Sequence, residues 1–257
     1  MSAQRFVGFL TTLAVLLSLT SQTAAEALPR IVIIIDDLGY QLEAGQRAID
    51  LPGPISYAIL PATPRGRMLA MAAHEQGKEV LLHLPLESVG HSGPNEPGGI
   101  TLDMGRMAFE QAFDAALESV PYAIGVSSHR GSLLTRHPGH MQWLMQEISE
   151  HDGMFFIDSY TTHRSVAMQV AAEVGVAATR RHVFLDNDRS PDAIGREFER
   201  LTELASRHGI AVAIGHPYPE TLAFLEQRLA ELDSQAIELI PVSKAINFVE
   251  PDRVNKL

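Results

Sequence analysis

Acidic, imidazole and hydroxyl side chains recur in this sequence directly after short apolar runs. The residues in these positions are Asp36 and Asp37, His83, Ser128 and His129, Asp158 and Ser159, Asp186 and Asn187, and His216. Any one of them has an ordinary explanation, because Asp, Asn and Ser often end strands and cap the next helix. Their joint occurrence after most of the apolar runs favours one shared site over coincidence.

Two imidazoles and one carboxylate with an open fourth position form a common ligand set of catalytic zinc. Asp37, His83 and His129 can supply this set, so a divalent metal, most simply zinc, is the expected cofactor. Such an ion lowers the pKa of a coordinated water from about 15.7 to about 7. Asp36 then remains free as the base for that water, and His216 can act as the acid that protonates a leaving group.

Paired carboxylates also serve glycoside hydrolysis, in which the two groups lie about 5 to 9.5 Å apart across the scissile bond. Asp36 and Asp158 follow different apolar runs and could fill these roles, but that chemistry gives the histidines no part. A dinucleotide site is excluded, because Asp36-Asp37-Leu38-Gly39 stands where a glycine-rich phosphate turn would be needed. Metal-assisted hydrolysis is therefore the favoured interpretation.

The composition narrows the ligands and partners that the site can have. The chain has 257 residues, of which 46% are hydrophobic and 20% charged, so it can bury the core of one domain. It contains no cysteine, which leaves His and carboxylate groups as metal ligands. The 31 Asp and Glu residues outnumber the 20 Lys and Arg residues, giving a formal charge of −11. Because no basic run offers a contact for phosphates, nucleic acid is not an expected partner.

The first 25 residues have the pattern of a secretory signal peptide. Arg5 supplies a positive charge, Phe6–Leu19 is apolar and rich in small residues, and Thr23-Ala24-Ala25 resembles a cleavage site. An uncleaved anchor is the alternative, but the apolar run is shorter than the ~20 residues that a bilayer span needs. We therefore expect an exported protein, periplasmic or secreted, with no stable membrane span after cleavage and a single domain at 26–257.

Short apolar runs alternate with amphipathic stretches over the rest of the chain. The runs expected to form strands are Ile31–Ile35, Ile55–Leu60, Glu79–Leu84, Tyr122–Ser127, Met154–Ile157, His182–Leu185, Ile210–Ile214 and Ile237–Ile240. The stretches expected to form helices are Gly105–Ser119, Gly139–Glu150, Ser190–Arg207 and Glu220–Leu232. Continuous apolar strands are typical of a parallel sheet covered on both faces. The repeat predicts an α/β fold that closes wholly or partly into a barrel, with the reactive residues at the carboxyl ends of its strands.

One segment interrupts this alternation. Ser88–Gly99 is rich in glycine and proline and is too long for a simple connection. It is expected to be either a loop that contacts substrate or an excursion over the surface.

Five of these segments resemble, in order, the motifs of the divergent polysaccharide deacetylases. They are Ile35-Asp36-Asp37-Leu38-Gly39, His83-Leu84-Pro85-Leu86-Glu87, Ser127-Ser128-His129-Arg130-Gly131-Ser132, Phe156-Ile157-Asp158-Ser159 and Ile214-Gly215-His216-Pro217. The resemblance covers essentially all of the chain beyond the leader. It implies a distorted (β/α) barrel of about seven strands, and removal of acetyl groups from N-acetylated amino sugars of an envelope or extracellular polysaccharide. It also implies that Asp36 is the base and Asp37 a metal ligand.

The sequence departs from the mainstream polysaccharide deacetylases in two places. Their second motif carries two histidines four residues apart, where this chain has His83 and Glu87. Glu87 either replaces a ligand or lies outside the ligand set, in which case His129 supplies the missing imidazole. The arginine that steadies the catalytic Asp in the mainstream enzymes has no recognisable counterpart here, although Arg130 or Arg164 could substitute.

A wider set of residues is expected to orient the ligands or to contact substrate. Its members are Glu87, Ser128, Arg130, Asp158, Ser159 and Asp186. Within this set, Asp158 is expected to orient a histidine ligand or His216. The two departures also fit a second hypothesis, a non-catalytic metal- or glycan-binding envelope protein that regulates cell-wall enzymes.

Overall fold

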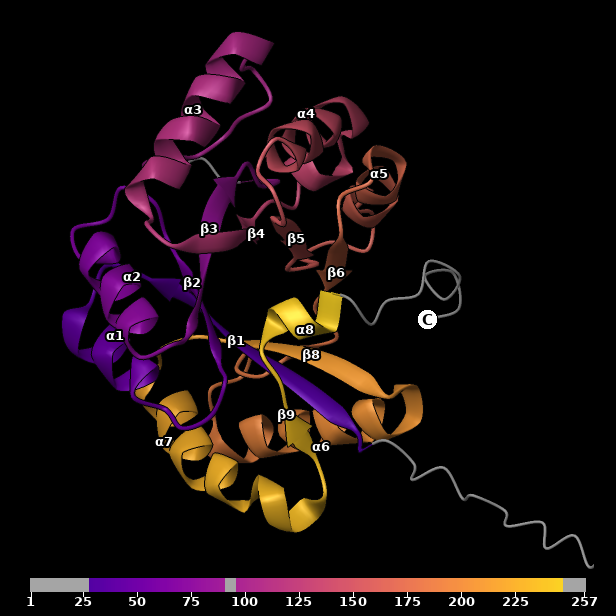
Figure 1. Cartoon of the computed structure of the whole chain (residues 1–257). Helices are drawn as coiled ribbons and strands as arrows, with labels where there is room; N and C mark the ends of the chain where they lie inside the picture. The colour runs from indigo at the N-terminus through magenta and orange to yellow at the C-terminus, as the bar shows by residue number, and fades with distance from the viewer. Residues whose placement is uncertain (1–27, 91–95, 247–257) are drawn as a thin grey trace, which may run out of the picture.

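Runs of buried β-branched residues form the strands at the centre of the molecule. In β1 (Arg30–Leu38), every residue from Ile31 to Ile35 is fully buried. The computed structural model describes residues 28–90 and 96–246 (Figure 1). The other strands are β2 (Ser56–Ile59), β3 (Glu79–Leu86), β4 (Ala123–Arg130), β5 (Phe155–Asp158), β6 (Ala178–Arg180), β7 (Val183–Phe184), β8 (Ile210–Gly215) and β9 (Glu238–Leu239).

Helices follow nearly every strand, as a repeat of β and α units requires. They are α1 (Leu42–Ile49), α2 (Gly66–Glu75), α3 (Arg106–Ser119), α4 (Pro138–Ser149), α5 (Ala167–Val174), α6 (Pro191–His208), α7 (Pro219–Arg228) and α8 (Val242–Ile246). Two short 3-10 helices, η1 (Leu134–Arg136) and η2 (Leu229–Gln235), complete the described elements.

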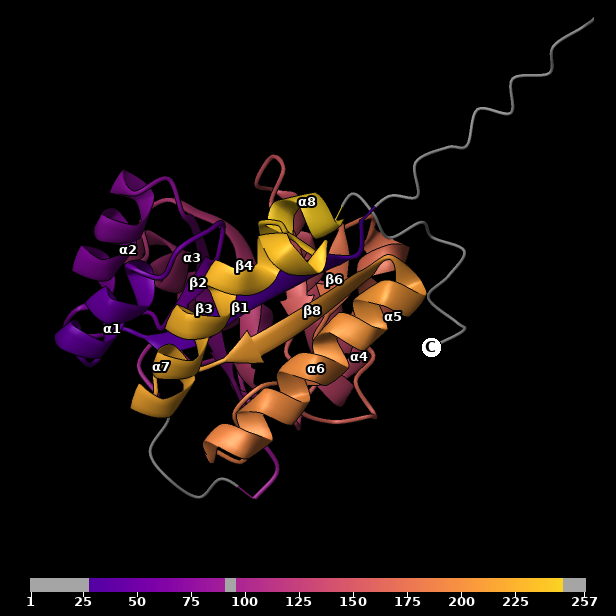
Figure 2. The same ribbon diagram turned by 90° about the horizontal axis from the view of Figure 1, so that it is seen from below.

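The strands pair in parallel in the order β6-β5-β4-β3-β2-β1-β8-β7, and β9 lies beside β1. This sheet curls into a half-barrel with helices around it, so the predicted barrel-like α/β fold is confirmed (Figures 1 and 2). Each of the expected strand segments overlaps a strand of the structure. The sequence pattern missed β6, because three residues are too few to show a periodicity.

The two faces of the sheet pack into two separate cores. In β1, Ile31, Ile33 and Ile35 belong to the large core between the sheet and the helices. Val32 and Ile34 belong to a smaller core that also contains residues of α8. Figure 1 shows α8 at the centre of the view with the other helices around it, so the smaller core is the interior of the half-barrel. Successive residues of a strand therefore face the outer layer and the interior in turn.

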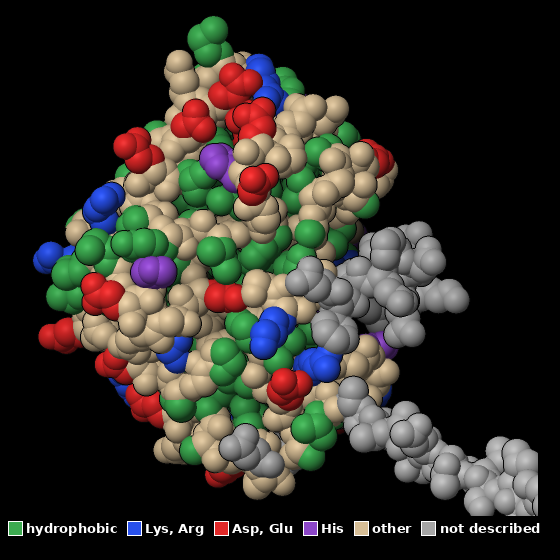
Figure 3. Space-filling model, viewed as in Figure 1, with side chains coloured by type: hydrophobic (Ala, Val, Ile, Leu, Met, Phe, Trp, Pro, Cys, Tyr) green, Lys and Arg blue, Asp and Glu red, His purple; other side chains and the backbone are tan. Residues whose placement is uncertain are grey.

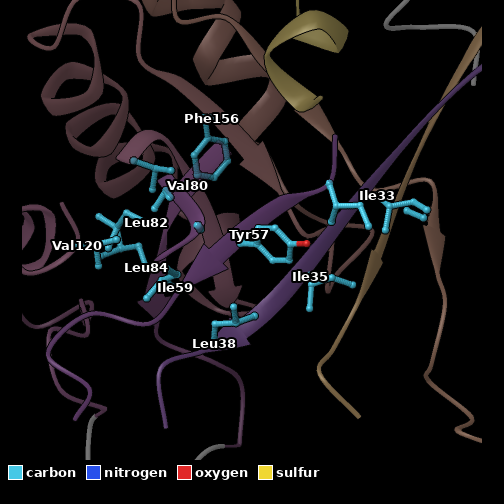
Figure 4. Close-up of a cluster of buried hydrophobic side chains, with 14 of the residues drawn as sticks. Ile33, Ile35, Leu38, Tyr57, Ile59, Val80, Leu82, Leu84, Val120 and Phe156 are labelled. Atoms are coloured by element: carbon cyan, nitrogen blue, oxygen red, sulfur yellow. The ribbon is translucent and has the colours of Figure 1, made fainter. Parts of the chain in front are cut away.

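The outer core is built from large aliphatic and aromatic side chains. Figure 4 shows Ile33, Ile35 and Leu38 of β1 near Tyr57 of β2, all of them buried. The Tyr57 hydroxyl donates a hydrogen bond of 2.6 Å to the carbonyl oxygen of Ala48, which satisfies this polar group inside an apolar layer.

Helix α8 closes one end of the interior through a small polar network. The Glu79 carboxylate at the start of β3 accepts hydrogen bonds from the Ser56 hydroxyl (3.0 Å) and the backbone N–H of Ser243 (3.1 Å). The Ser56 oxygen in turn accepts the backbone N–H of Val242 at 3.2 Å. Because this network occupies the amino ends of β2 and β3, the site expected from the sequence must lie at the opposite end.

The surface in Figure 3 carries red and blue side chains interspersed with green ones, and no broad basic area gathers on that face. Within residues 28–90 and 96–246, no helix is long and apolar enough to cross a membrane. The expected signal peptide at 1–25 lies outside the described residues.

Candidate metal centre

Alternate residues of each strand face the interior of the half-barrel, and this alternation decides which reactive side chains lie close together. In β1 the interior positions are Val32, Ile34 and then Asp36. In β3 Leu81 faces the interior, so His83 does as well. His83 pairs across the sheet with Ser127 of β4, which places Ser127 and His129 on the same side. Strands that run in parallel therefore bring these polar groups to one end of the interior.

Asp37 reaches the same place because the backbone of β1 is irregular at this residue. In a regular strand its side chain would point away from that of Asp36. Asp37 instead has a left-handed backbone with φ 63°, and the register between β1 and β2 shifts between Ile35 and Leu38. The adjacent Gly39 has φ 138°, and a Cβ there would come within 2.2 Å of Thr63 Oγ1. This turn therefore brings two consecutive carboxylates to one site.

Three ligand-type atoms converge at the centre of this cluster. Asp37 Oδ1 lies 3.1 Å from His83 Nε2 and 2.8 Å from His129 Nδ1. The two imidazole nitrogens are 3.1 Å apart. Asp37 Oδ1 is buried, yet it has no hydrogen-bond partner of suitable geometry among the described residues. Buried polar atoms normally have partners, so a bound cation is the natural partner for this oxygen.

The donor set fits a divalent metal. Among residues 28–90 and 96–246, Asp37, His83 and His129 form the group of His and acidic side chains arranged to hold one. Two nitrogen ligands and one oxygen ligand suit zinc, and three protein ligands leave a coordination position open.

Each histidine of the ligand set is oriented through its other ring nitrogen. His83 Nδ1 lies 3.0 Å from the buried hydroxyl of Ser127. His129 Nε2 lies 2.9 Å from a carboxylate oxygen of Glu96, whose other oxygen lies 2.7 Å from Arg130 Nη2. Such contacts fix the ring and the tautomer of a metal-ligating histidine. The imidazole atoms that face Asp37 are thus held in place before any ion binds.

Asp36 is buried beside the ligand set without belonging to it. Its Oδ2 lies 3.5 Å from His83 Nε2, and its Oδ1 has no hydrogen-bond partner among the described residues. Burial raises the pKa of the Asp36 carboxyl, although the nearby His83 and His216 act in the opposite direction. For Asp37, burial alone would raise the pKa, but its contacts with His129 and His83 outweigh this and lower it. The pKa values of the two adjacent carboxyls are therefore shifted in opposite directions.

His216 enters the cluster just after β8, with its ring held by a buried carboxylate. Its Nδ1 lies 2.8 Å from Asp186 Oδ1. Asp186 Oδ2 accepts hydrogen bonds from the backbone N–H of His216 (2.6 Å) and from the Thr221 hydroxyl (2.8 Å). Burial alone would lower the pKa of His216, but Asp186 and the charge of Asp37 raise it. The Nε2 atom, 3.7 Å from Asp37 Oδ2, is left facing the cluster.

The expectation that Asp158 orients a histidine is wrong. Its carboxylate accepts hydrogen bonds from the Ser165 hydroxyl (2.7 Å) and the backbone N–H of Tyr160 (2.8 Å). The physical reason is the side-chain alternation of β5: Ile157 faces the interior, so Asp158 faces the helices. Asp186 holds His216 instead.

Ser128 and Ser159 lie next to the cluster, and no hydrogen bond joins either hydroxyl to a ligand atom among the described residues. The Ser128 hydroxyl oxygen accepts the backbone N–H of Ser159 at 3.0 Å, which joins the ends of β4 and β5. Ser159 Oγ is buried without a hydrogen-bond partner among the described residues. Ser128 pairs with Leu84, which belongs to the outer core, so its side chain faces the helices and the expectation that it orients a ligand or contacts substrate is wrong.

Glu87 lies outside the ligand group. Its carboxylate oxygen Oε2 accepts the backbone N–H of Leu102 at 2.7 Å, which ties β3 to the segment before α3. Of the two alternatives left open by the sequence, the geometry brings His129 to the ligand set and uses Glu87 to hold a loop. Sequence reasoning missed Glu96, the one acidic residue near the end of the glycine- and proline-rich segment 88–99.

Neither arginine suggested by the sequence faces Asp36. Arg130 pairs with Glu96, and the exposed Arg164 donates its backbone N–H to the Thr162 hydroxyl. The guanidinium whose charge interacts with Asp36 belongs to Arg181, between β6 and β7: burial lowers its pKa, and Asp36 raises it. It was missed because a single arginine between two short strands has no motif around it.

Sequence comparison finds one family and two relatives that match most of the chain. The sequence profile described as divergent polysaccharide deacetylase matches residues 33–246. The Escherichia coli (strain K12) protein YibQ, described as uncharacterized, is 35% identical over 239 residues, 93% of this chain and 73% of YibQ. An uncharacterized protein of Haemophilus influenzae is 37% identical over 203 residues, 79% of this chain and 72% of that protein.

Solved structures share the architecture at low sequence identity. The uncharacterized protein ATU2773 from Agrobacterium tumefaciens C58 has a TM-score of 0.82 at 22% identity, over 86% of this chain and 91% of its own. The T48 deacetylase, in a structure with substrate, has a TM-score of 0.54 at 10% identity, over 87% of this chain and 93% of its own. A BA3943 mutant, a CE4 family pseudoenzyme with restored enzymatic activity, has a TM-score of 0.50 at 13% identity, over 85% and 68%. At these identities the likeness shows the fold.

The orientation of His129 by Glu96 makes a prediction about metal affinity. Glu96→Gln removes a negative charge from the far side of the ring, so zinc affinity should fall by about 10- to 100-fold. Glu87→Gln is the matched control, because that carboxylate contacts Leu102 N and should leave the affinity within about threefold. Competition with a chromophoric chelator measures both. An equal or larger loss with Glu87→Gln would show that Glu87 belongs to the ligand set.

Proposed function

The chain belongs to the divergent polysaccharide deacetylase family, and from that premise we propose that it is an exported, metal-dependent hydrolase that removes acetyl groups from an N-acetylated amino sugar of an envelope or extracellular polysaccharide. One observation carries the proposal. A three-residue ligand set lies between a buried carboxyl, Asp36, and an imidazole, His216, that is itself held by Asp186. Metal-assisted hydrolysis of an amide uses a metal site with a base and an acid close to it.

Asp37, His83 and His129 would hold the metal, for which zinc is our proposal. When bound, such an ion polarises the acetyl carbonyl and makes water easier to ionise. Low proton affinity keeps Asp37 ionised and available as a ligand at the pH values where the histidines are neutral. Ser127 and Glu96 hold the two rings so that their free nitrogens face Asp37.

Asp36 is the proposed base. Its burial raises the proton affinity of the carboxylate, which suits a group that must take a proton from the attacking water. The water oxygen bonds to the carbonyl carbon of the acetamide, and its proton passes to an Asp36 oxygen. Asp36 Oδ1 is the suitable acceptor, because it is buried and has no hydrogen-bond partner among the described residues.

His216 is the proposed acid. Asp186 accepts the Nδ1 proton and stabilises the imidazolium, so Nε2 carries the transferable proton on the side of the cluster. As the C–N bond breaks, this proton passes to the departing amine nitrogen, and acetate and the free amino sugar result. Positioned acids and bases of this kind each contribute about 10²- to 10⁴-fold to rate.

Export rests on the sequence of the first 25 residues. Their positive, apolar and small-residue regions support cleavage of a signal peptide and a periplasmic or secreted location for the rest of the chain. The amino-terminal residue of the protein recovered from cell fractions tests this part of the proposal.

Asp36→Asn should abolish acetate release while leaving the metal bound. The substitution removes the proton acceptor but keeps the size of the side chain, so kcat should fall by at least about 10²-fold. Acetate is measured after incubation of the zinc-loaded protein with N-acetylglucosamine oligomers, and zinc content is measured on the same samples. His74→Ala, at an exposed histidine stacked on Tyr122 (ring centroids 3.8 Å apart), is the matched control.

Full activity of Asp36→Asn would contradict the assignment of the base. Zinc binding by the wild-type chain with no acetate release under any added metal would instead favour the non-catalytic alternative, a metal- or glycan-binding envelope protein that regulates cell-wall enzymes.

The pH dependence of the reaction should have two limbs. Activity needs Asp36 deprotonated and His216 protonated, so it rises as pH passes the raised pKa of Asp36 and falls as pH passes that of His216. Asp186→Asn removes a charge that raises the pKa of His216, so the alkaline limb of kcat/KM should move to lower pH. The acid limb should stay in place. An unchanged alkaline limb in this variant would exclude His216 as the acid.

A further inference from the structure

A groove beside the candidate centre lies along the connection between β6 and β7, which contains no helix. Among the described elements, each other pair of consecutive strands is separated by at least one helix, whereas only Arg181 and His182 stand between β6 and β7. Here the chain passes from its pairing with β5 to its pairing with β8, through backbone bonds from Arg181 N to Asp158 O and from His182 N to Val212 O. The groove between this segment and α6 has a volume of about 620 Å³.

Positive charge gathers in this groove, although the chain as a whole is acidic, with a formal charge of −11. Arg180, Arg181 and Arg200 line it. Among its described lining residues the acidic side chain is Glu197, which lies 3.0 Å from Arg200 Nη1. The lining residues themselves thus carry three guanidinium groups against one carboxylate, while the buried carboxylates of Asp36 and Asp158 act on Arg181 from behind the groove.

The positive charge of the groove also affects the pKa of His182. Its pKa is lowered to about 4, first by burial and then by the positive charges of Arg180 and His208. Its Nδ1 accepts the backbone N–H of Val212 at 3.0 Å, so the neutral ring belongs to the groove wall. A wall of this kind favours an anion over a cation.

Aromatic rings hold two of the guanidinium groups in position. Arg180 lies over the Tyr160 ring at 4.7 Å, and Arg181 lies over the Phe184 ring at 4.7 Å. Arg181 also donates from Nε to Ser159 O (2.7 Å) and from Nη2 to Tyr160 O (3.1 Å). Arginine fixed in this way loses little conformational freedom when it binds a planar oxyanion such as a carboxylate.

The groove adjoins the candidate centre. Phe184, which lines the groove, meets the His216 ring edge-on with 5.2 Å between centroids. Asn187, which also lines the groove, directly follows Asp186, and the charge of Arg181 acts on Asp36. A polymer with one sugar at the centre can therefore continue into the groove.

We propose that this groove binds acidic sugars of the same glycan whose N-acetyl group lies at the metal centre, so that the substrate class is an anionic polysaccharide. The inference rests on the proposed function, which decides that an N-acetylated sugar of the glycan lies at the metal centre. Binding of the neighbouring sugars in the groove is measurable without turnover. Carboxylates of the chain meet Arg180 and Arg200, while Arg181 stays bound to backbone carbonyls.

Two oligosaccharide probes test the proposal directly. One is a hyaluronan octasaccharide, in which N-acetylglucosamine alternates with glucuronate, and the other is a neutral oligomer of N-acetylglucosamine. Calorimetric titration of the purified protein should give a Kd at least about tenfold lower for the acidic probe at low salt. The difference should shrink as salt concentration rises, because the contacts are ionic and partly exposed.

Matched arginine variants locate the binding. Arg180→Gln and Arg200→Gln should each weaken binding of the acidic probe by about five- to tenfold. Arg207→Gln, on the same helix as Arg200 but outside the groove and paired with Glu203, should stay within about twofold. Arg200 is 57% exposed in its side chain, so its variant tests the groove even if Arg180→Gln does not fold.

Equal binding of the neutral and acidic probes would overturn the proposal, as would an effect of Arg207→Gln equal to that of Arg200→Gln. Acetate release from both oligomers is measured in parallel. Retained groove binding without acetate release would contradict the proposed function alone, and acetate release without preference for the acidic probe would contradict the groove alone.

Discussion

Two neighbouring carboxylates serve one site in this protein, and a regular strand cannot present them that way. The left-handed backbone at Asp37, with φ 63°, and the register shift beside it bring both Asp36 and Asp37 within reach of His83 Nε2. A residue in this conformation costs about 1–3 kcal/mol unless its surroundings compensate. Gly39 makes the turn possible, because a Cβ there would meet Thr63. Every role assigned to the centre depends on this local departure from strand geometry.

The same turn separates the chemistry of the two carboxyls. Asp37 meets two imidazoles, which lower its pKa, whereas Asp36 lies deeper and its pKa is raised by burial. Pairs of titratable groups whose environments push their pKa values apart are typical of sites that divide labour between a ligand or stabiliser and a proton acceptor. Asp186 stabilises the protonated form of His216 and so raises its pKa, which suits a proton donor. The raised pKa values of Asp36 and His216 are those that the proposed base and acid require.

Much of the fold could be predicted from the sequence, because β-branched runs such as Ile31–Ile35 have few alternatives to a covered parallel strand. The gathering of Asp36, His83, His129 and His216 followed from the rule that parallel strands share their carboxyl ends. This rule does not say to which face of the sheet a side chain points. Asp158 therefore looked equivalent to the residues of the cluster, although it faces the helices. Glu96 and Arg181 act from loops, where neither periodicity nor a motif gives a side chain its direction.

The central claim is that Asp37, His83 and His129 together hold a catalytic divalent metal. A crystal of the zinc-loaded protein, with anomalous diffraction recorded at the zinc edge, tests it most directly. We expect one anomalous peak bonded to Asp37, His83 Nε2 and His129 Nδ1, with Asp36 and Glu87 outside the ligand set. A peak bonded to Glu87 instead of His129, or no peak at this site at saturating zinc, would contradict it.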